Sequence, residues 1–584
     1  MATANGWIRV GTIGEIAERG CTVVRGHDRP IAVFYHEGQV FAVDNRCPHM
    51  GFPMHRGTVK DGLLTCHWHH ARFDLRSGCT FDLFADDLPS FPVEVRGEEV
   101  WVSSVPRGGD PVAAARRRLR EGLEQNISLI SAKALLALLR AGVDYREIVR
   151  EIARFGARYR DGWASGMTIL TAMANLVPRL SEETAYLALY QGARRVAQDC
   201  AGQVPRRDRA PLASDELPFS RLLDWMAYWT TVRHRDGAER TLLTAIRAGE
   251  PREQLALLLF SAATQRYYAD TGHVLDFCNK AFELLDLIGW EEAEAILPTV
   301  IGQLVAARGG EELNSWRHPV DLVALVQEAV AALPQAQSEG EGRTWHGERD
   351  LAHAILGEDP GAIAAAIVAA VRQGARPEQL TRALAYAAAL RIARFGPANE
   401  FGDWIVALHT FTYCNALHVA VRRCPHPLLL RGVLHGAMSV YLDRFLNVPP
   451  APLPGERDSL DDLPTDGETL RAEFLCALDS QHQVDHAARL VARYLDLGHD
   501  PQPLIDTLTY AVVREDADFH TFQMVEAAAR QFDEWGPSPE GRDLLVAAAR
   551  YLAAHSPTQR AQLQTARIAL RLHRGEAIYE EVSA

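Results

Sequence analysis

The sequence predicts a multidomain protein in which a small all-β domain is followed by a large all-α helical-repeat domain. Up to about residue 104, short runs rich in Val, Ile, Phe and Tyr alternate with Gly and Asp turns, as in antiparallel strands. From about residue 114, Ala, Leu, Arg and Glu dominate, and apolar residues recur at intervals of three and four. A chain of 584 residues is also too long for a single hydrophobic core.

The composition is typical of a globular protein in water. Apolar residues make up 47% of the chain and charged residues 23%, and the net charge is −14. Nucleic acid would require a basic surface, and no stretch reaches the roughly 18 uninterrupted apolar residues of a membrane span. Met1–Trp7 shows no signal peptide, and the nine sparse cysteines are unlike a secreted disulfide framework. We therefore expect a cytoplasmic protein that binds neither nucleic acid nor membrane.

The β domain is expected to occupy residues 1–105 and to end with a hairpin. A cluster of Pro and Gly follows it, so residues 106–113 are predicted to form a linker, and residues 114–584 the helical domain. The strands are expected at Thr22–Val24, Ile31–Tyr35, Val40–Val43, Val93–Val95 and Val100–Val102.

The helical domain contains a repeated pattern. In four segments a helix ends at a Gly, and an aliphatic residue opens the next helix six positions later. Gly suits a helix C-terminus because the left-handed conformation needed there disfavours a Cβ. Helices rich in Leu and Ala that end in Gly would resemble one another even without a repeat, but we favour about four units, each of several helices. Linkers are expected near residues 204–215, 333–345 and 447–467. The glycines are Gly142, Gly249, Gly374 and Gly498.

The most specific motif consists of two short segments that each contain one Cys and one His. The first is Cys47-Pro-His49-Met-Gly, and the second is Cys66-His-Trp-His69. A Rieske [2Fe–2S] cluster takes two thiolates on one iron and two imidazoles on the other, which is the set that two such loops provide. With these motifs, residues 7–104 resemble the Rieske ferredoxins and the ferredoxin-like domains of Rieske oxygenases. The resemblance implies a cluster bound by Cys47, His49, Cys66 and His69 that transfers single electrons.

A zinc site is the competing interpretation, since Cys and His at short spacings also bind zinc. The flanking Gly residues and the Phe-Asp pair after the second loop favour the cluster. Three further histidines lie beside the motif, but their spacing does not match the family, so they are expected to face solvent or to pack around the ligands. These are His55, His67 and His70, the last at a position where the family usually has a small residue.

The resemblance also bears on the redox potential. In the Rieske proteins of respiratory complexes a disulfide links the two loops, and the matching positions here are Phe52 and Trp68. We therefore expect a midpoint potential in the low part of the Rieske range, and electron delivery to an oxygenase rather than quinol oxidation. The sequence has no flavin or nicotinamide fingerprint, so the electron donor is expected to be a separate reductase.

The helical domain does not contain the usual iron motif of a Rieske oxygenase. That motif is Asp-x-x-His-x-x-x-x-His with a later carboxylate. Asp350 and His353 begin it, but Glu358 stands where the second His should be. The family's iron domain is also built around a sheet, which nothing after residue 113 predicts. The chain is therefore not expected to be an ordinary Rieske oxygenase α subunit.

The repeat provides a different candidate for a metal site. When the units are aligned on their glycines, three of them carry a His at the start of a related helix, and the first carries Met167. If the units surround a common interior, the three imidazoles converge, and three His with an open position suit Fe(II) or Zn(II). Histidines satisfied within the core are the alternative. The three are His273, His409 and His520. Lys280 shares the helix face of His273, and His435 and His418 are further candidate ligands, although His418 lies about half a turn out of phase with His409.

Two functional hypotheses follow. In the first, the [2Fe–2S] cluster passes electrons to a mononuclear non-haem iron in the helical domain, where a small-molecule substrate is oxidised. In the second, the protein is a non-enzymatic electron carrier or redox sensor, and the helical array is a docking scaffold for a separate enzyme. Only the first hypothesis requires a second metal.

Overall fold

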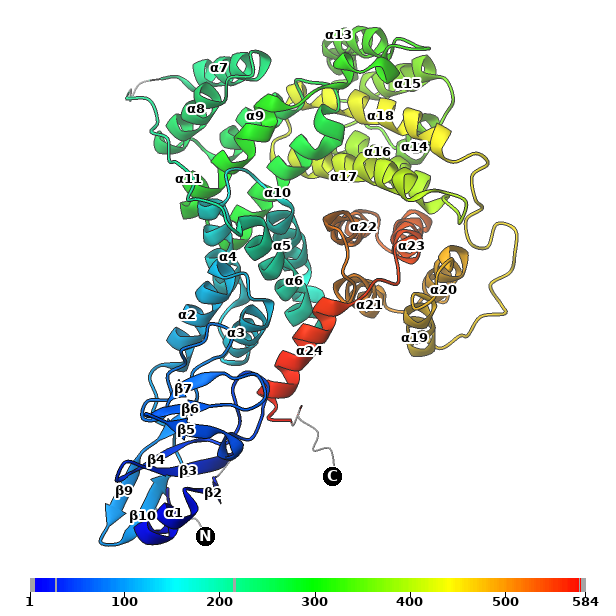
Figure 1. The fold of residues 1–584 in the computed structure, drawn as a ribbon. Helices are drawn as coiled ribbons and strands as arrows, with labels where there is room; N and C mark the ends of the chain where they lie inside the picture. Colours follow the sequence, from blue (N-terminus) through cyan, green and yellow to red (C-terminus); the bar gives the residue numbers. More distant parts are fainter. Residues whose placement is uncertain (1–5, 27–28, 214–216, 577, 579–584) are drawn as a thin grey trace. The chain divides into compact units, whose positions relative to one another are not determined.

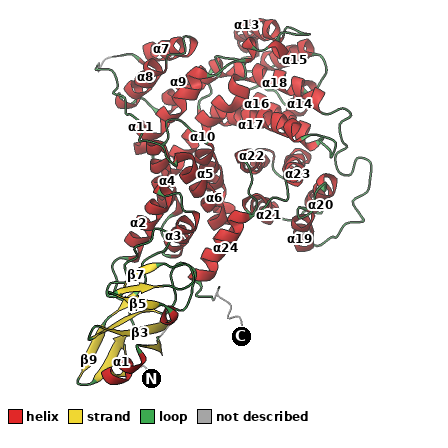
Figure 2. Cartoon of the chain, viewed as in Figure 1, coloured by secondary structure: helices red, strands yellow, loops and turns green. Residues whose placement is uncertain are grey.

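The computed structural model describes residues 6–26, 29–213, 217–576 and 578 (Figures 1 and 2). Residues 1–5 of the predicted β domain, and residues 214 and 215 of the first predicted linker, lie outside this range. Within it, an all-β domain is followed by helices, as predicted, and 62% of the chain is helical. The chain forms two compact units: the first comprises residues 1–148 and 561–584, and the second, called the helical unit below, comprises residues 149–560.

The β domain consists of three antiparallel sheets. Their strand orders are β1-β10-β9, β2-β3-β4-β8 and β5-β6-β7. One hydrophobic cluster, which includes Ile31 and Val100, joins the first two sheets, and another surrounds Cys47 and Cys66. The strands are β1 (Trp7–Thr12), β2 (Cys21–Arg25), β3 (Pro30–His36), β4 (Gln39–Asp44), β5 (Thr58–Lys60), β6 (Leu63–Thr65), β7 (Arg72–Asp74), β8 (Ser90–Phe91), β9 (Val93–Arg96) and β10 (Glu99–Ser103).

The remaining elements are helices. The α-helices of the first unit are α1 (Ile13–Arg19), α2 (Pro111–Glu124), α3 (Ser128–Arg140) and α24 (Ala561–His573), and α4 (Tyr145–Tyr159) begins in it. Those of the helical unit are α5 (Ser165–Leu176), α6 (Glu182–Cys200), α7 (Phe219–Thr231), α8 (Arg235–Arg247), α9 (Arg252–Ala263), α10 (His273–Ile288), α11 (Ala293–Ile296), α12 (Ile301–Ala306), α13 (Leu322–Gly340), α14 (Glu348–Ile355), α15 (Pro360–Arg372), α16 (Pro377–Ala393), α17 (Phe401–Arg423), α18 (Arg431–Asp443), α19 (Gly467–Ala477), α20 (Val484–Asp496), α21 (Pro501–Val513), α22 (Phe519–Trp535) and α23 (Pro539–Ala554).

The four glycines of the repeat pattern have the conformation that the sequence predicted. Each stands two residues after a helix, following α3, α8, α15 and α20 respectively. Their φ angles are positive, at 78°, 73°, 98° and 75°, which is the left-handed conformation that ends a helix. The helix after each glycine is followed in turn by α5, α10, α17 or α22, so the order of elements recurs four times.

These last four helices surround a common interior. Helix α5 packs against α10 and α22, and α17 packs against the same two helices, so that the four close a ring within the helical unit (Figure 1). The ring brings together segments more than a hundred residues apart in the sequence. It provides the shared interior on which the metal hypothesis depended.

Three features of the helical region differ from the sequence prediction. The segment 333–345 was predicted to be a linker, but α13 continues to Gly340 because it buries Leu333 and Ala336, although Pro334 lies within it. His409 does not start its helix: α17 begins two turns earlier, at a capping box formed by Glu400 and Asp403. Packing also groups α2, α3 and α24 with the β domain, whereas composition alone separated every helix from it.

Helix α17 is long and apolar enough to cross a membrane by length and composition alone, with a mean hydropathy of 1.2. In the structure, however, 78% of this stretch is buried inside the protein. Such burial is typical of a core helix, which needs the same apolar residues as a membrane span.

Candidate metal centres

Two loops of the β domain present the four predicted cluster ligands. Cys47 and His49 lie between β4 and β5, and Cys66 and His69 lie between β6 and β7. Each loop closes on itself through the backbone N–H of its Cys: that of Cys47 donates to the carbonyl of Phe52 at 2.8 Å, and that of Cys66 donates to Ala71 at 2.9 Å. These bonds hold the two Cys–His pairs in place.

The two thiols face each other. Cys47 and Cys66 are buried and share a side-chain hydrogen bond. This bond lowers the pKa of Cys66 to about 6, and together with burial it raises the pKa of Cys47. Backbone N–H groups also point at each sulfur, from His49 to Cys47 and from His69 to Cys66 among others. Such donors stabilise a thiolate, which is the form that binds iron.

The two imidazoles also face each other. The ring centroids of His49 and His69 are 4.8 Å apart, and the rings are nearly perpendicular. His49 is partly buried, and within the described residues its Nδ1 atom has no hydrogen-bond partner. Burial, together with the nearby His69, lowers the pKa of His49 to about 4, so the ring is neutral at pH 7. His69 is exposed.

These residues fit a Rieske cluster. The thiols form one pair and the imidazoles another, which corresponds to two thiolates on one iron and two imidazoles on the other. The orphaned Nδ1 atom of His49 is a buried polar atom that iron ligation would satisfy. A bound cluster supplies a centre that gains and loses one electron at a time.

The other histidines of the two loops have different partners. His55 bonds to the side chain of Asn45 at 3.0 Å, and His67 bonds to the hydroxyl of Thr58 at 2.5 Å. His70 is exposed, with a positive φ of 60°. At the positions of the disulfide in high-potential relatives, the rings of Phe52 and Trp68 lie 6.4 Å apart.

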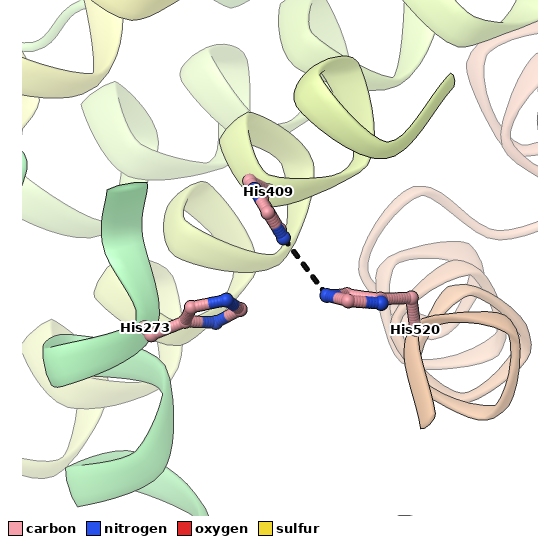
Figure 3. Close-up of side chains that lie close together, drawn as sticks. All are labelled: His273, His409 and His520. Atoms are coloured by element: carbon pink, nitrogen blue, oxygen red, sulfur yellow. Dashed lines mark hydrogen bonds between the residues drawn. The ribbon is translucent and has the colours of Figure 1, made fainter. Parts of the chain in front are cut away.

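In the helical unit, His273, His409 and His520 come together, as the sequence predicted (Figure 3). They extend from α10, α17 and α22, three of the four helices of the ring, and one nitrogen of each lies within 4.8 Å of the others. The Nε2 atoms of His409 and His520 are 2.8 Å apart. His520 is 8% exposed, and the other two are partly buried. The rings of Phe277 and Phe519 pack against His273.

The surroundings keep two of these imidazoles, those of His273 and His409, neutral. Burial lowers the pKa of His273 to about 4, and the adjacent His520 acts in the same direction. Burial likewise lowers the pKa of His409 to about 3, with a further contribution from His273. A carboxylate oxygen of Asp518 lies 3.5 Å from Nδ1 of His520. The neutral imidazole is the form that ligates a metal, so His273 and His409 are already in the state that binds a cation.

The segment before His273 is strained. Tyr268, Asp270 and Thr271 have φ angles of 47°, 49° and 51°, and Gly272 has a φ of 92°. A Cβ atom at Gly272 would lie 2.8 Å from Cβ of Tyr413 and 3.3 Å from the carbonyl oxygen of His409. Only glycine therefore lets the start of α10 approach α17 closely enough to place His273 beside His409. Backbone strain of this kind is concentrated at functional sites.

The other candidates lie outside this group. His435 is buried and stacks on Tyr267, and His418 bonds to the hydroxyl of Thr381 at 2.9 Å. Asp350 and His353, which began the usual iron motif, are exposed on α14. Met167, the fourth member of the column, lies on α5. Lys280 forms ion pairs with Glu283 and Glu526.

A buried network of charged and amide side chains continues along the same helices. One turn after His273 and His520, Asp276 accepts a hydrogen bond from Gln523 at 2.5 Å. Further along, the Lys280 ammonium lies 2.8 Å from Glu283 and 2.7 Å from Glu526. Arg530 of α22 and Asn175 of α5 contact the same two glutamates.

Most of this network was not predicted from the sequence. The signal was present in the spacing, because Asp276 and Lys280 follow His273 by three and seven residues and so share its helix face. The positive charges of Lys280 and Arg530 balance the negative charges of the two glutamates. Asp276 is a further carboxyl group without a matching positive charge, and burial raises its pKa to about 7.

The comparisons with known proteins concern the β domain. A family model of the Rieske [2Fe-2S] domain matches residues 6–92, and the helical remainder matches no family model. The 3-phenylpropionate/cinnamic acid dioxygenase ferredoxin subunit of Photorhabdus laumondii is 33% identical over 96 residues, which are 16% of this chain and 90% of that subunit. A human Rieske domain-containing protein is 39% identical over 66 residues, or 11% of this chain, and the match spans 41% of its length.

Among solved structures, the ferredoxin of carbazole 1,9a-dioxygenase from Nocardioides aromaticivorans has 24% identity. The alignment covers 17% of this chain and 98% of that ferredoxin, with a TM-score of 0.16. The dioxygenase ferredoxin subunit is 33% identical to this chain, and the match covers 90% of that subunit. The two Cys–His loops agree with this match. Through its N-terminal domain, the chain belongs to the Rieske [2Fe–2S] family.

Proposed function

We propose that this protein is an oxygenase in which the Rieske cluster supplies electrons to a mononuclear non-haem iron held by His273, His409 and His520. The observation that carries the proposal is the convergence of these three imidazoles in the interior of the helix ring. Three protein ligands leave coordination positions free for oxygen and substrate. A ferrous ion bound there supplies a place at which dioxygen is reduced.

The arrangement favours a metal site over three core histidines. Buried polar groups normally pair with a complementary donor or acceptor. Here the imidazoles of His273 and His409, whose pKa values are lowered, face the imidazole of His520 instead. The Nε2 atoms of His409 and His520 point at each other. One proton can satisfy only one such pair of nitrogens, whereas a cation satisfies all three. The strained backbone before His273 costs free energy, and burying a histidine in an ordinary core does not require such strain.

The relatives support an electron-delivering role. Besides the dioxygenase ferredoxin subunit, a 4beta-methylsterol monooxygenase of Methylococcus capsulatus is 35% identical over 79 residues. We propose that electrons reach the cluster from a separate reductase and that the substrate is a small molecule. All nine cysteines are free in the structure, and we propose the reducing cytoplasm as the location.

Metal analysis of the full chain tests the proposal. Protein loaded anaerobically with iron should contain about three irons for each spectroscopically counted cluster. His409→Ala should lower this ratio towards two and leave the Rieske signal intact, because it removes one of three ligands. His435→Leu is the matched control, since it removes a buried histidine of the same unit from outside the group. A ratio of two in the unsubstituted protein, unchanged by His409→Ala, would refute the proposal.

The alternative is a non-enzymatic electron carrier or redox sensor with a helical docking scaffold. It is supported by the nature of the relatives, several of which are ferredoxin components of oxygenase systems. In that case the three histidines would contribute only to packing. Iron would stay at two per chain, and their substitution would change stability alone.

A further inference from the structure

Two helices that follow the β domain contribute charged side chains near the cluster ligands: Lys133 of α3 contacts the loop that carries His49, and Arg118 of α2 contacts the neighbouring segment 83–86. Lys133 of α3 donates from its ammonium group to the carbonyl oxygen of Pro48 at 2.9 Å. Pro48 stands between the ligands Cys47 and His49. A helix outside the β domain is therefore bonded directly to a cluster-binding loop, and it brings a positive charge with it.

The counter-ion of Lys133 is Asp86. The two side chains form an ion pair, and Asp86 also accepts from Arg118 of α2 at 2.9 Å. Arg118 further donates to the carbonyl of Ala85 at 2.9 Å. The Lys133 side chain is only 13% exposed, so solvent screens its charge weakly.

The segment 84–86, which contains Asp86, also contacts the cluster ligand His49. The ring of Phe84 lies 5.0 Å from that of His49, in an edge-on contact. Lys133 is bonded to Pro48, the residue before His49, and its ion-pair partner Asp86 stands two residues after Phe84. A lysine and an aspartate of opposite charge thus lie near one iron ligand, and all of these residues belong to the first compact unit.

We propose that Lys133 and Asp86 form a charge pair that sets the midpoint potential of the [2Fe–2S] cluster. Reduction adds one negative charge to the cluster. A nearby ammonium group stabilises the reduced form and raises the midpoint potential, whereas a nearby carboxylate lowers it. Lys133 and Asp86 are positioning and tuning residues and do not ligate the iron. The helical region that follows the β domain therefore adjusts the driving force of electron transfer.

Redox titration of the full chain, followed by the visible circular dichroism of the cluster, tests this proposal. Lys133→Met should lower the midpoint potential, because Asp86 remains beside the cluster. Asp86→Asn should raise it, because Lys133 remains. Lys133→Arg keeps the positive charge and should restore a potential close to that of the unsubstituted protein. Lys60→Met, which removes an exposed lysine on β5, is the control and should leave the potential unchanged.

The opposite directions of the two expected potential shifts separate a charge effect from a disturbed fold. A damaged loop would shift the midpoint potential in the same direction in Lys133→Met and Asp86→Asn, or would lose the cluster. The double variant would then show a larger shift, or a greater loss of cluster, than either single variant. The charge account expects the double variant to lie between the two single variants. Shifts of the same sign in the two single variants, or no shift in either, would overturn the proposal.

Discussion

At the scale of single residues, chemistry depends on which ring nitrogens and sulfurs face each other. His49 and His69 face each other across the space between the two loops, while His67, between Cys66 and His69 in sequence, turns to Thr58. Sequence spacing alone could separate these roles, because the Cys-x-His and Cys-x-x-His pattern is specific to the family. It could not show that His49 is partly buried and His69 exposed, because His49 packs against Phe84, which is distant in sequence.

The cluster assignment predicts a spectroscopic loss. His49→Ala or His69→Ala should abolish the low average g value that the reduced, histidine-ligated cluster gives in electron paramagnetic resonance, because each removes an iron ligand. His67→Ala is the matched control in the same loop and should retain the signal. A signal that survives both ligand substitutions unaltered would show that other residues hold the iron.

The lowered pKa values of His273 and His409 predict a loss of stability in acid. In the unfolded chain these side chains bind a proton below about pH 6.5, whereas the metal-free fold keeps them neutral down to about pH 4 and 3. Their contribution to stability is complete above pH 6.5 and decreases as the pH falls through this window. Between pH 6.5 and 4.5 the loss is at most about 2.7 kcal/mol per histidine.

Urea unfolding of metal-free protein at several pH values measures this effect. His409→Gln should make the stability less dependent on pH between 6.5 and 4.5, because it removes one ring with a lowered pKa. His353→Gln, on the exposed face of α14, should leave the dependence unchanged. An equal dependence in the His409 variant and the unsubstituted protein would contradict the pKa assignment.

At the scale of helices and strands, local signals predicted elements well and long-range packing poorly. The strands around Val33 and Val100 followed from β-branched runs between turns, and Gly249 marked a helix end by its need for positive φ. Helix α1 was missed because it is short and depends on the Thr12–Glu15 capping box. Pro334 suggested a linker, but burial of the surrounding apolar residues keeps that segment helical.

The convergence of the three histidines was predictable only through the repeat. Equivalent places in related units become neighbours when the units close a ring, so His273, His409 and His520 could be selected together. The partners of Lys280 could not, because Glu526 lies on a helix 246 residues away in sequence. Nor did any pattern predict the left-handed residues before His273, which respond to the close approach of α17.

This close approach predicts the effect of a substitution that changes no histidine. Gly272→Ala places a methyl group 2.8 Å from Cβ of Tyr413 in a backbone conformation that disfavours side chains. It should separate α10 from α17, displace His273 and lower iron retention in the helical unit, with the Rieske signal preserved. Gly402→Ala, at an open position on α17, is the control. Full iron retention in the Gly272 variant would show that the approach does not position the ligand.

At the scale of the whole molecule, one chain combines a cluster that carries electrons with a helical unit whose centre is polar. The polar centre is costly, because charges such as those of Lys280 and Glu283 lose hydration when they are buried. In the proposed function it supports a cation site between the ring helices.

The predicted midpoint potential follows from the two aromatic residues that stand where high-potential Rieske proteins have a disulfide. With aromatic residues at Phe52 and Trp68 in place of a disulfide, the potential should fall in the low part of the roughly −150 to +300 mV Rieske range. Delivery of electrons to an oxygenase requires such a reducing cluster. A measured midpoint above about +200 mV would instead point to a high-potential electron acceptor.

Anomalous X-ray scattering at the iron edge, from crystals of the full chain loaded with iron under anaerobic conditions, tests the central claim most directly. The proposed function predicts a strong feature from the two cluster irons in the β domain and a separate single peak in the helical unit. That peak should lie about 2.0–2.1 Å from one nitrogen of each of His273, His409 and His520. Scattering from the cluster alone, or a third iron bound elsewhere, would contradict the account.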